Sequence, residues 1–446
     1  MRVELFAEKL FAAGKEAGFT DMEVYFQSGS QFRVGIFKRE IDSYSLAEDA
    51  GLSFRGLYNG KMGYAYTEKL DESSLQMLIN DARENAQLVD SDEVAEIFAG
   101  SESYAQLEGH NPRLDAIQAE EKIALAKALE EKAYALDQRV FNVQAFFGDG
   151  AGERRIINSK GLNLVYRGNS AMAGLSVVAR QEREAKTAHE MEQIEDLAQF
   201  DVDEIARKAV DEAVSLFGAD TVPSGEYPII LRRDVASQML GVLTASFSAE
   251  NVQKGMSLLK DRIGQQVFSE KITIIDDPLM PGRPASCPFD AEGVATRTKQ
   301  VVENGKLMTY LHNLKTARID GVESTGNASK RSYKSPLGIA PSNFYIAAGE
   351  KSYDEIIAGT EEGIIVISVA GLHSGANPVS GDFSLGAYGY LVQGGKVVRP
   401  VNQITIAGNF FRMLNDVLEV GNDLKFGRGS IVSPTLKIAR LSVAGK

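Results

Sequence analysis

Residues 373–390 read HSGANPVSGDFSLGAYGY, and two patterns meet in them. The first half is rich in turn-forming residues, whereas Phe383, Leu385 and Ala387 then alternate with small or polar residues. Alternation with a period of two is typical of a strand that buries one face. The Gly394–Gly395 pair that follows predicts a hairpin turn. This stretch is therefore either a loop that contacts a ligand or the turn-rich entrance to a buried sheet in the second half of the chain.

The pattern of the chain changes at residues 223–225 (PSG). Because 446 residues exceed what one core ordinarily holds, two domains are expected. Helix, strands and helix follow one another twice in the first part, and strands and turns dominate the second. We predict an α+β fold with a first domain at residues 1–220, built from duplicated helix–antiparallel strands–helix units at about 1–88 and 114–218. Residues 221–446 are predicted to form a predominantly antiparallel curved β-sheet or barrel.

Two periodicities predict the elements of the first domain. Apolar residues spaced by three and four indicate helices, and strict alternation indicates strands. The Asn59–Gly60 pair marks a hairpin turn, and residues 90–113 form an acidic connection between the two units. The expected helices are 3–17, 71–87, 115–135 and 201–217, and the expected strands are 22–27, 31–37, 41–48, 51–58, 61–66, 140–147, 153–158, 163–168 and 173–181.

The acidic composition limits the partners that the sequence favours. With 48 Lys and Arg against 61 Asp and Glu, the net charge is −13, which argues against direct nucleic-acid binding. The longest apolar run, residues 363–372, is too short to span a membrane, and the charged N-terminal residues do not fit a signal peptide. The lone Cys287 excludes an internal disulfide. We expect a cytoplasmic protein with neither a nucleic-acid nor a membrane partner.

Motifs for known chemistries are scarce. Phosphate-loop, dinucleotide and nucleophile-elbow patterns are absent from the sequence. His189 begins an HE pair, but Gln193 stands where an HExxH motif needs its second histidine. Cys287 has no neighbouring base to form a thiolate, so no catalytic role is assigned to it. The acidic pairs at 276–277 and 290/292 lack the further oxygen ligands of a cation site, and we expect solvated turns there.

One titratable base, one amide and one carboxylate lie close together in the opening stretch, as His373, Asn377 and Asp382. The glycines around them permit positive φ and the close approach of a ligand. On composition alone, two interpretations stay open: a ligand-contacting loop, or turns at the corners of a curved sheet. These three residues are candidates for peptide or interface contacts.

Three long motifs of the second domain carry a family resemblance. They are IGQQVFSEKITIIDD at 263–277, FDAEGVATRTKQVVENGKL…STGNA from 289, and NPVSGDFSLGAYGYLVQGGKVVRPVNQITIAGNFFRML…VGND from 377. Together they resemble the TldD/PmbA (TldE) family, also called "modulator of DNA gyrase". The resemblance covers nearly all of residues 225–446, and the first domain agrees with the family in length and layout.

The resemblance implies two kinds of chain. TldD-type chains carry a metal-binding HExxxH helix after a strand that matches residues 227–231, and a cysteine near the C-terminus as third ligand. Here Gly241 and Ser246 stand where the two histidines would lie, and Val242 where the glutamate would. The cysteine position falls around 427–430, which contains no cysteine. The chain thus resembles the PmbA/TldE type, for which we predict no catalytic residue, no metal ligand and no cofactor, with zinc in a TldD-type partner.

The function implied by this resemblance is that of the PmbA/TldE-type subunit of a metallopeptidase complex that processes unfolded peptides. The chain would pair with a TldD-type homologous subunit, or with itself, to enclose a cavity that admits extended peptide. The main alternative is a stand-alone homodimeric peptide-binding or scaffold protein without proteolytic activity. An autonomous hydrolase that uses Cys287 or His373, and a DNA-linked regulator, are less favoured by the residues.

Overall fold

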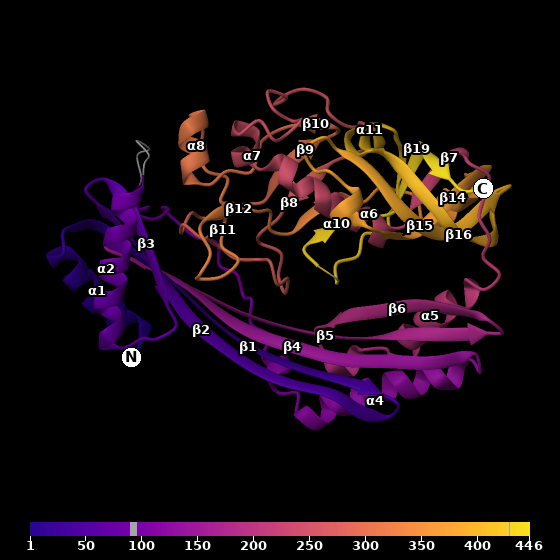
Figure 1. Cartoon of the computed structure of the whole chain (residues 1–446), viewed down its shortest axis with the longest axis horizontal. Coiled ribbons are helices and arrows are strands. Elements are labelled where there is room, and N and C mark those ends of the chain that lie inside the picture. The colour runs from indigo at the N-terminus through magenta and orange to yellow at the C-terminus, as the bar shows by residue number, and fades with distance from the viewer. Residues whose placement is uncertain (90–95, 428) are drawn as a thin grey trace.

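The computed structural model describes residues 1–89, 96–427 and 429–446. Its N-terminal domain contains long strands between helices (Figure 1). The elements are α1 (Val3–Glu16), β1 (Phe19–Phe37), β2 (Glu40–Tyr58), β3 (Lys61–Thr67), α2 (Glu72–Leu88), α3 (Pro112–Asp115), α4 (Ala119–Leu136), β4 (Val140–Asn158), β5 (Asn163–Gln181), β6 (Glu184–Ile194), a short 3-10 helix (Leu197–Gln199) and α5 (Val202–Ser215).

These strands form one six-stranded antiparallel sheet in the order β3-β2-β1-β4-β5-β6. The central pair β1–β4 runs from Glu23 opposite Asn158 to Phe37 opposite Gln144. The order β4-β5-β6 therefore mirrors β1-β2-β3 across the centre of the sheet. The predicted duplication of a helix–strands–helix unit is confirmed, and the two units share a single sheet.

Four strands of this sheet are longer than the sequence predicts. β1, β2, β4 and β5 each span 19 residues, where alternation indicated two shorter strands apiece. Glycine and serine at the apparent breaks do not end the strands, because the backbone there is paired on both sides; Gly150, for example, lies opposite Gln31 and Ser170. β6 was not predicted, since its charged residues hide the alternation and only Ala188 and Ile194 are buried.

Two further expectations concern the connection between the units and membrane spans. Residues 96–111 of the predicted connection are irregular, apart from a bridge between Gly109 and Gly168, and residues 90–95 lie outside the described residues. Within the described ranges, no helix is long and apolar enough to cross a membrane.

The two faces of the sheet have different neighbours. Along β1, Val24 joins the core beneath α1 and α2, and Val34 joins the core beneath α4 and α5. Tyr25 points to the opposite face, where it packs with Cys287 and Phe289 of the C-terminal domain. The helices thus cover the outer face, while the sheet arches beneath the C-terminal domain with its inner face toward it (Figure 1).

The C-terminal domain is rich in strands, several of them very short. Its helices are α6 (Arg233–Leu243), a 3-10 helix (Thr244–Phe247), α7 (Ala249–Gln253), α8 (Leu314–Asp320), α9 (Tyr353–Ala358), α10 (Leu372–Gly375) and α11 (Phe410–Asn415). Its strands are β7 (Gly225–Leu231), β8 (Ile274–Asp276), β9 (Lys299–Glu303), β10 (Lys306–Leu307), β11 (Ala328–Ser329), β12 (Gly338–Ile339), β13 (Phe344–Ile346), β14 (Glu362–Ala370), β15 (Asp382–Gln393), β16 (Lys396–Asn409), β17 (Val417–Val420), β18 (Ile431–Val432) and β19 (Leu436–Ala444).

Five of these strands close a barrel. Their order is β16-β15-β14-β7-β19, and β16 pairs again with β19. β14 and β7 are parallel, and the other neighbours in the barrel are antiparallel. The predicted antiparallel curved sheet or barrel is confirmed, and the opening stretch leads into β15 at Asp382 as a strand entrance. A second sheet, β10-β9-β8-β13-β18, and α6 share the barrel's core.

A buried group of charged residues joins the two domains. Arg55 Nε on β2 donates to Glu23 Oε1 on β1 at 2.7 Å, and Arg55 Nη1 lies 3.6 Å from Glu292 Oε1 of the C-terminal domain. Burial raises the pKa of Glu23, and the charge of Arg55 opposes that shift. One guanidinium therefore holds a carboxylate from each domain in a contact from which water is excluded.

Lys330 extends this contact from the C-terminal domain to the inner face of the sheet. Its Nζ donates to Ser53 Oγ at 2.7 Å and lies 5.0 Å and 4.7 Å from the ring centres of Tyr25 and Tyr64. Burial, together with repulsion from Arg55, lowers the pKa of Lys330 to about 7. The contact thus combines an ion pair, a hydrogen bond and two cation–π contacts.

One glycine in the barrel can be tested for the close approach that it permits. A Cβ at Gly389 would lie 1.8 Å from the carbonyl oxygen of Ile365, whereas a Cβ at Gly386 would meet only the Cβ of Ala370 at 3.9 Å. Gly389→Ala should lower the free energy of unfolding by about 1–3 kcal/mol, because the backbone of β14 must move. Gly386→Ala, on the same strand, should stay within about 0.5 kcal/mol of the wild type. Equal urea midpoints for the two variants would contradict this packing.

The buried ion pair predicts a pH-dependent loss of stability. Arg55→Met should lower the free energy of unfolding by about 3–5 kcal/mol at neutral pH, since Glu23 and Glu292 are left buried and unpaired. Because the pKa of Glu23 is already raised above 4.5 in the folded protein, stability falls as pH rises between the unfolded and folded pKa values. Removing Arg55 raises the folded-state pKa of Glu23 further, which widens the pH range over which stability falls. The difference in the free energy of unfolding between the variant and the wild type should therefore shrink as the pH is lowered toward about 5.

The matched control is an exposed ion pair of the barrel. Arg440 Nη1 lies 3.2 Å from Glu226 Oε2, with both side chains more than half exposed. Arg440→Met should change the free energy of unfolding by less than about 1 kcal/mol. Chemical denaturation of both variants across this pH range measures the difference, and a deficit for Arg55→Met that does not vary with pH would count against the buried carboxylates as its cause.

Candidate functional site

A cavity of about 770 Å³ opens between the two domains beside α6. One wall is formed by β6 and α5 of the N-terminal domain, and the other by α6, Tyr353 and the segment that precedes β19. A volume of this size suits a small ligand or a few residues of a peptide. The lining residues are His189, Glu190, Met191, Glu192, Lys208, Glu212, Arg232, Arg233, Asp234, Ser237, Gln238, Gly241, Tyr353, Asp423, Lys425, Gly427, Gly429, Ser430, Ile431, Val432 and Ser433.

An ion-pair network connects the two walls of this cavity. Arg232, just before α6, pairs with Glu212 of α5 and lies 2.7 Å from Asp234. Burial alone would lower the pKa of Arg232, but hydrogen bonds and charges from these two carboxylates raise it. Burial also raises the pKa of the neighbouring Tyr353 hydroxyl. The network therefore ties α5 of one domain to α6 of the other.

The structure brings together the two segments in which ligand positions were sought from the sequence. Gly241 of α6 lines the cavity, and Gly427, Gly429 and Ser430 line the facing wall; Arg428 lies outside the described residues. Two segments that are almost two hundred residues apart in the chain thus meet at one cavity. This juxtaposition makes the cavity beside α6 the candidate functional site.

The residues at these positions do not fit a zinc ion. Gly241 has no side chain, and Val242 packs against the barrel core. Ser246 is buried, and its hydroxyl donates to the carbonyl oxygen of Pro378 at 3.2 Å. Zinc sites use His, Cys and carboxylate ligands, and in the described ranges no group of three such side chains is placed to hold a metal. Positions 241, 242 and 246 therefore supply no histidine, cysteine or carboxylate ligand for zinc.

Three of the four acidic residues in these pairs, Asp276, Asp290 and Glu292, are buried and Asp277 is half-buried, so the expectation of solvated turns is wrong. Asp276 is fully buried and accepts hydrogen bonds from Lys299 Nζ at 2.9 Å and Asn327 Nδ2 at 2.7 Å. Asp290 accepts the backbone N–H of Ala328 at 3.0 Å. These donors lie far along the chain, which is why the local sequence did not reveal them. Both carboxylates organise loops around the domain interface.

The three candidates from the opening stretch lie at one exposed turn. His373 is in α10, and Asn377 Oδ1 accepts the backbone N–H of Ser380 at 3.2 Å. Asp382 Oδ1 accepts a hydrogen bond from Asn409 Nδ2 at 2.9 Å. These bonds give Asn377 and Asp382 a structural role at the start of β15. Contact of any of the three with a peptide or a partner chain stays a prediction.

Cys287 is buried in the contact between the sheet and the C-terminal domain. Burial raises the pKa of its thiol, although the nearby Arg154 guanidinium opposes the shift. A protonated and enclosed thiol is a poor nucleophile at neutral pH. Its contacts with Tyr25 and Phe289 make Cys287 part of the domain interface.

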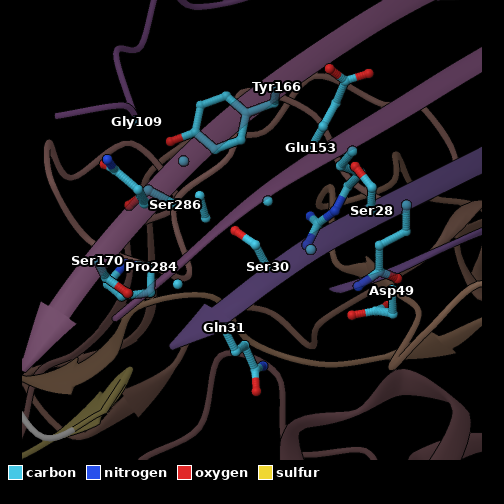
Figure 2. A pocket seen from close by; sticks show the side chains of 18 of the residues that line it. Ser28, Ser30, Gln31, Asp49, Gly109, Glu153, Tyr166, Ser170, Pro284 and Ser286 are labelled. Atoms are coloured by element: carbon cyan, nitrogen blue, oxygen red, sulfur yellow. The ribbon is translucent and has the colours of Figure 1, made fainter. Parts of the chain in front are cut away.

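A smaller hollow of about 340 Å³ lies on the inner face of the sheet (Figure 2). Its floor is the middle of β1, β4 and β5, and Pro284 and Ser286 of the C-terminal domain lie over it. Gly150 and Gly152 leave the backbone of the floor bare; a Cβ at Gly150 would lie 3.0 Å from the carbonyl oxygen of Ser30. Serine hydroxyls surround the floor in Figure 2, together with the ring of Tyr166 and the carboxylates of Asp49 and Glu153. The hollow thus offers backbone groups, hydroxyls and charged side chains rather than an apolar pocket.

Comparison with known proteins identifies the family. Models of the PmbA/TldA metallopeptidase domain 1, central domain and C-terminal domain match residues 22–86, 112–217 and 224–445. The crystal structure of a putative modulator of a DNA gyrase from Thermotoga maritima is 34% identical, with a TM-score of 0.92, and the match covers 99% of this chain and 100% of that chain. The chain belongs to the PmbA/TldD family.

Other members of the family are similar over almost the whole chain. The metalloprotease PmbA of Escherichia coli O157:H7 is 25% identical over 439 residues, which cover 96% of this chain and 93% of that protein. The crystal structure of TldE from Thermococcus kodakarensis has a TM-score of 0.87 and covers 99% of this chain and 100% of that chain. At 24% identity, that likeness shows a shared fold.

Sequence reasoning on this PmbA/TldD family member missed the N-terminal wall of the site. Glu192 of β6 and Lys425 pair across the cavity at 2.7 Å, and neither residue was singled out. The sequence RRD at 232–234 could have indicated an ion-pair site here. Cations at the N-terminal end of a helix are unfavourable unless carboxylates neutralise them. The partner Glu212 lies on α5, and only the fold places it there.

Position 241 offers a direct test of the site's geometry. Gly241 lies inside α6, and a Cβ there would meet no atom within 4 Å. Gly241→Ala should therefore raise the free energy of unfolding by about 0.5–1 kcal/mol, because helix-interior glycine is unfavourable relative to alanine. Thermal and urea unfolding measure the change, and a destabilised variant would show that the cavity is filled at this point.

Proposed function

We propose that this chain is the PmbA/TldE-type subunit of a TldD/TldE-like metallopeptidase complex that processes unfolded peptides. It forms one part of a peptide-enclosing vessel, and a TldD-type homologous subunit supplies the zinc ion and the general base. The chain itself binds no cofactor and cleaves no bond. The complex acts in the cytoplasm, which agrees with a chain that has one buried, unpaired cysteine.

The cavity beside α6 is the observation that supports this proposal most. Both domains wall it, and its volume of about 770 Å³ can accept a peptide segment. At the positions where a TldD-type chain would carry its ligands, Gly241, Val242 and Ser246 offer none. A chain with the cavity and without the ligands is suited to hold a peptide that another subunit cuts.

The inner face of the sheet supports an extended polypeptide as the substrate class. Gly150 and Gly152 expose backbone at the centre of the sheet, and Ser28 and Ser30 add hydroxyls beside it (Figure 2). Backbone and hydroxyl groups can bond the main chain of any peptide in an extended conformation, whatever its side chains. A folded protein would not present its main chain in this way, so the substrate is expected to be unfolded.

The proposal predicts that activity needs two chains. Purified alone, this chain should contain no stoichiometric zinc by metal analysis and should not cleave an unfolded peptide such as a casein fragment. Mixed with the TldD-type chain of the same organism, it should form a complex that contains zinc and cleaves the peptide. A chelator should abolish that cleavage, and added zinc should restore it.

The controls separate this function from the alternatives. The TldD-type chain alone should show little or no cleavage, since its vessel is incomplete. Stoichiometric zinc and cleavage in this chain alone would overturn the proposal. A stable homodimer that binds the peptide, and that gains no activity with the TldD-type chain, would instead support a stand-alone peptide-binding or scaffold protein.

A further inference from the structure

Among the residues that the structure describes, none pairs with the outer side of β2 over about half its length, so this edge of the long sheet is open. From Glu40 to Ala50, β2 pairs with β1 on one side, while β3 pairs only with Leu52–Tyr58 on the other. Every residue from Glu40 to Ala50 is exposed. β2 lies along the border of the sheet in Figure 1. Its backbone N–H and C=O groups on that side form a template on which another strand can pair.

The outer face of this open edge is apolar. Ile41, Tyr44 and Leu46 are 46%, 55% and 67% exposed. Their partners on β1 belong to the core beneath α4 and α5, and Tyr44 packs edge-on against Phe32 with ring centres 5.2 Å apart. The core beneath α4 and α5 therefore extends as far as β2, where these three apolar side chains are exposed. An edge that only needed protection from aggregation would not carry three large apolar residues.

The charge of the edge decides what can cover it. Glu40, Asp42, Glu48 and Asp49 lie on it, and residues 40–50 contain no Lys or Arg. Two copies of this chain paired along the edge would bring together two such sets of carboxylates and no cation. Like charges on paired strands are destabilising. The edge is therefore unsuited to a second copy and suited to a strand that carries basic residues.

The basic residues close to the edge lie at one end of it or are engaged elsewhere. Lys122 Nζ lies 4.6 Å from the ring centre of Phe32, on which Tyr44 packs, and pairs with Asp149 of β4. Lys38 and Arg39 lie in the turn between β1 and β2, at one end of the open stretch. The guanidinium of Arg33 lies over the ring of Phe146, 5.4 Å from its centre. Both Arg33 and Phe146 point to the inner face of the sheet, away from Tyr44 and Leu46. The middle of the open edge thus keeps its negative charge.

We propose that Glu40–Ala50 of β2 is the docking edge for a strand of the TldD-type partner, and that this strand alternates Lys or Arg with apolar residues. This inference rests on the proposed function for the identity of the partner. Pairing would extend the sheet across the two chains and cover Ile41, Tyr44 and Leu46. Charge complementarity would favour the heterodimer over the homodimer, because only a basic strand lowers the repulsion along the edge.

Two variants and a matched control test the docking edge. Asp42→Lys/Glu48→Lys reverses the charge at two positions of the edge and brings the net charge of residues 40–50 from −4 to zero. Leu46→Ser removes the most exposed apolar side chain of the edge. Asp81→Lys/Glu84→Lys makes the same change of net charge on the exposed face of α2, away from the edge. Affinity for the TldD-type chain of the same organism would be measured by sedimentation at low and high salt. Circular dichroism would verify that each variant is folded.

The double lysine variant should raise Kd about tenfold or more at low salt, and its binding should depend less on salt. Leu46→Ser should weaken binding at both salt concentrations, whereas the α2 control should bind as the wild type does. Unchanged affinity of both edge variants would overturn the inference. So would a wild-type homodimer that dissociates when the edge is changed, because the occupant would then be a second copy.

Cleavage of an unfolded peptide, measured on the same mixtures, distinguishes failure of this inference from failure of the proposed function. If the chains bind through the edge and the complex does not cleave, the proposed function fails and the docking edge stands. If cleavage and binding are both retained when the negative charge of the edge is neutralised, the proposed function stands and the docking edge is wrong.

Discussion

The guanidinium of Arg55 sets the position of one domain relative to the other. It lies 2.7 Å from a carboxylate of the sheet and 3.6 Å from a carboxylate of the C-terminal domain, and all three side chains are buried. Such a contact gains little net stability, but a shift of either domain would leave a buried charge unpaired. Arg232 repeats the arrangement at the other end of the interface through Glu212. Both cavities lie along this interface: Arg232 and Glu212 line the larger one, and the middle of the sheet forms the floor of the smaller one.

The middle of the sheet carries glycine and polar side chains where it faces the C-terminal domain. Strands of 19 residues cross the whole N-terminal domain, with apolar residues at both ends and glycine or serine between them. At the ends, Val24 and Val34 face separate helical cores. In the middle, Gly150 and Gly152 leave the backbone accessible on the inner face. A sheet with one continuous core would be more stable, since glycine buries no apolar area, but it would leave no polar floor under the C-terminal domain.

The sequence predicted the fold better than the site, for a physical reason. Alternation and helical spacing are local properties, so the duplicated units and the antiparallel barrel could be predicted from single windows of sequence. The prediction failed where glycine in a paired strand resembled a break, as at Gly150, and where an edge strand such as β6 buries too few residues to alternate. The site depends on contacts between distant segments. Family motifs located Gly241 and the segment near Ser430, but the opposite wall at Glu192 and Glu212 belongs to another domain, and no local pattern connects it to α6.

The residues at positions 242 and 246 also contribute to the packing around the barrel. A metal centre would require several polar donors to be held together at the end of that helix, and its stability would depend on the metal. Here Ser246 is satisfied by the carbonyl oxygen of Pro378, and Val242 packs on the barrel core. The barrel can therefore complete its core without any ion. Under the proposed function, a subunit with anchored domains and one open acidic edge would reach its final shape before it meets a partner. The metal-dependent step of assembly would then belong to the other chain.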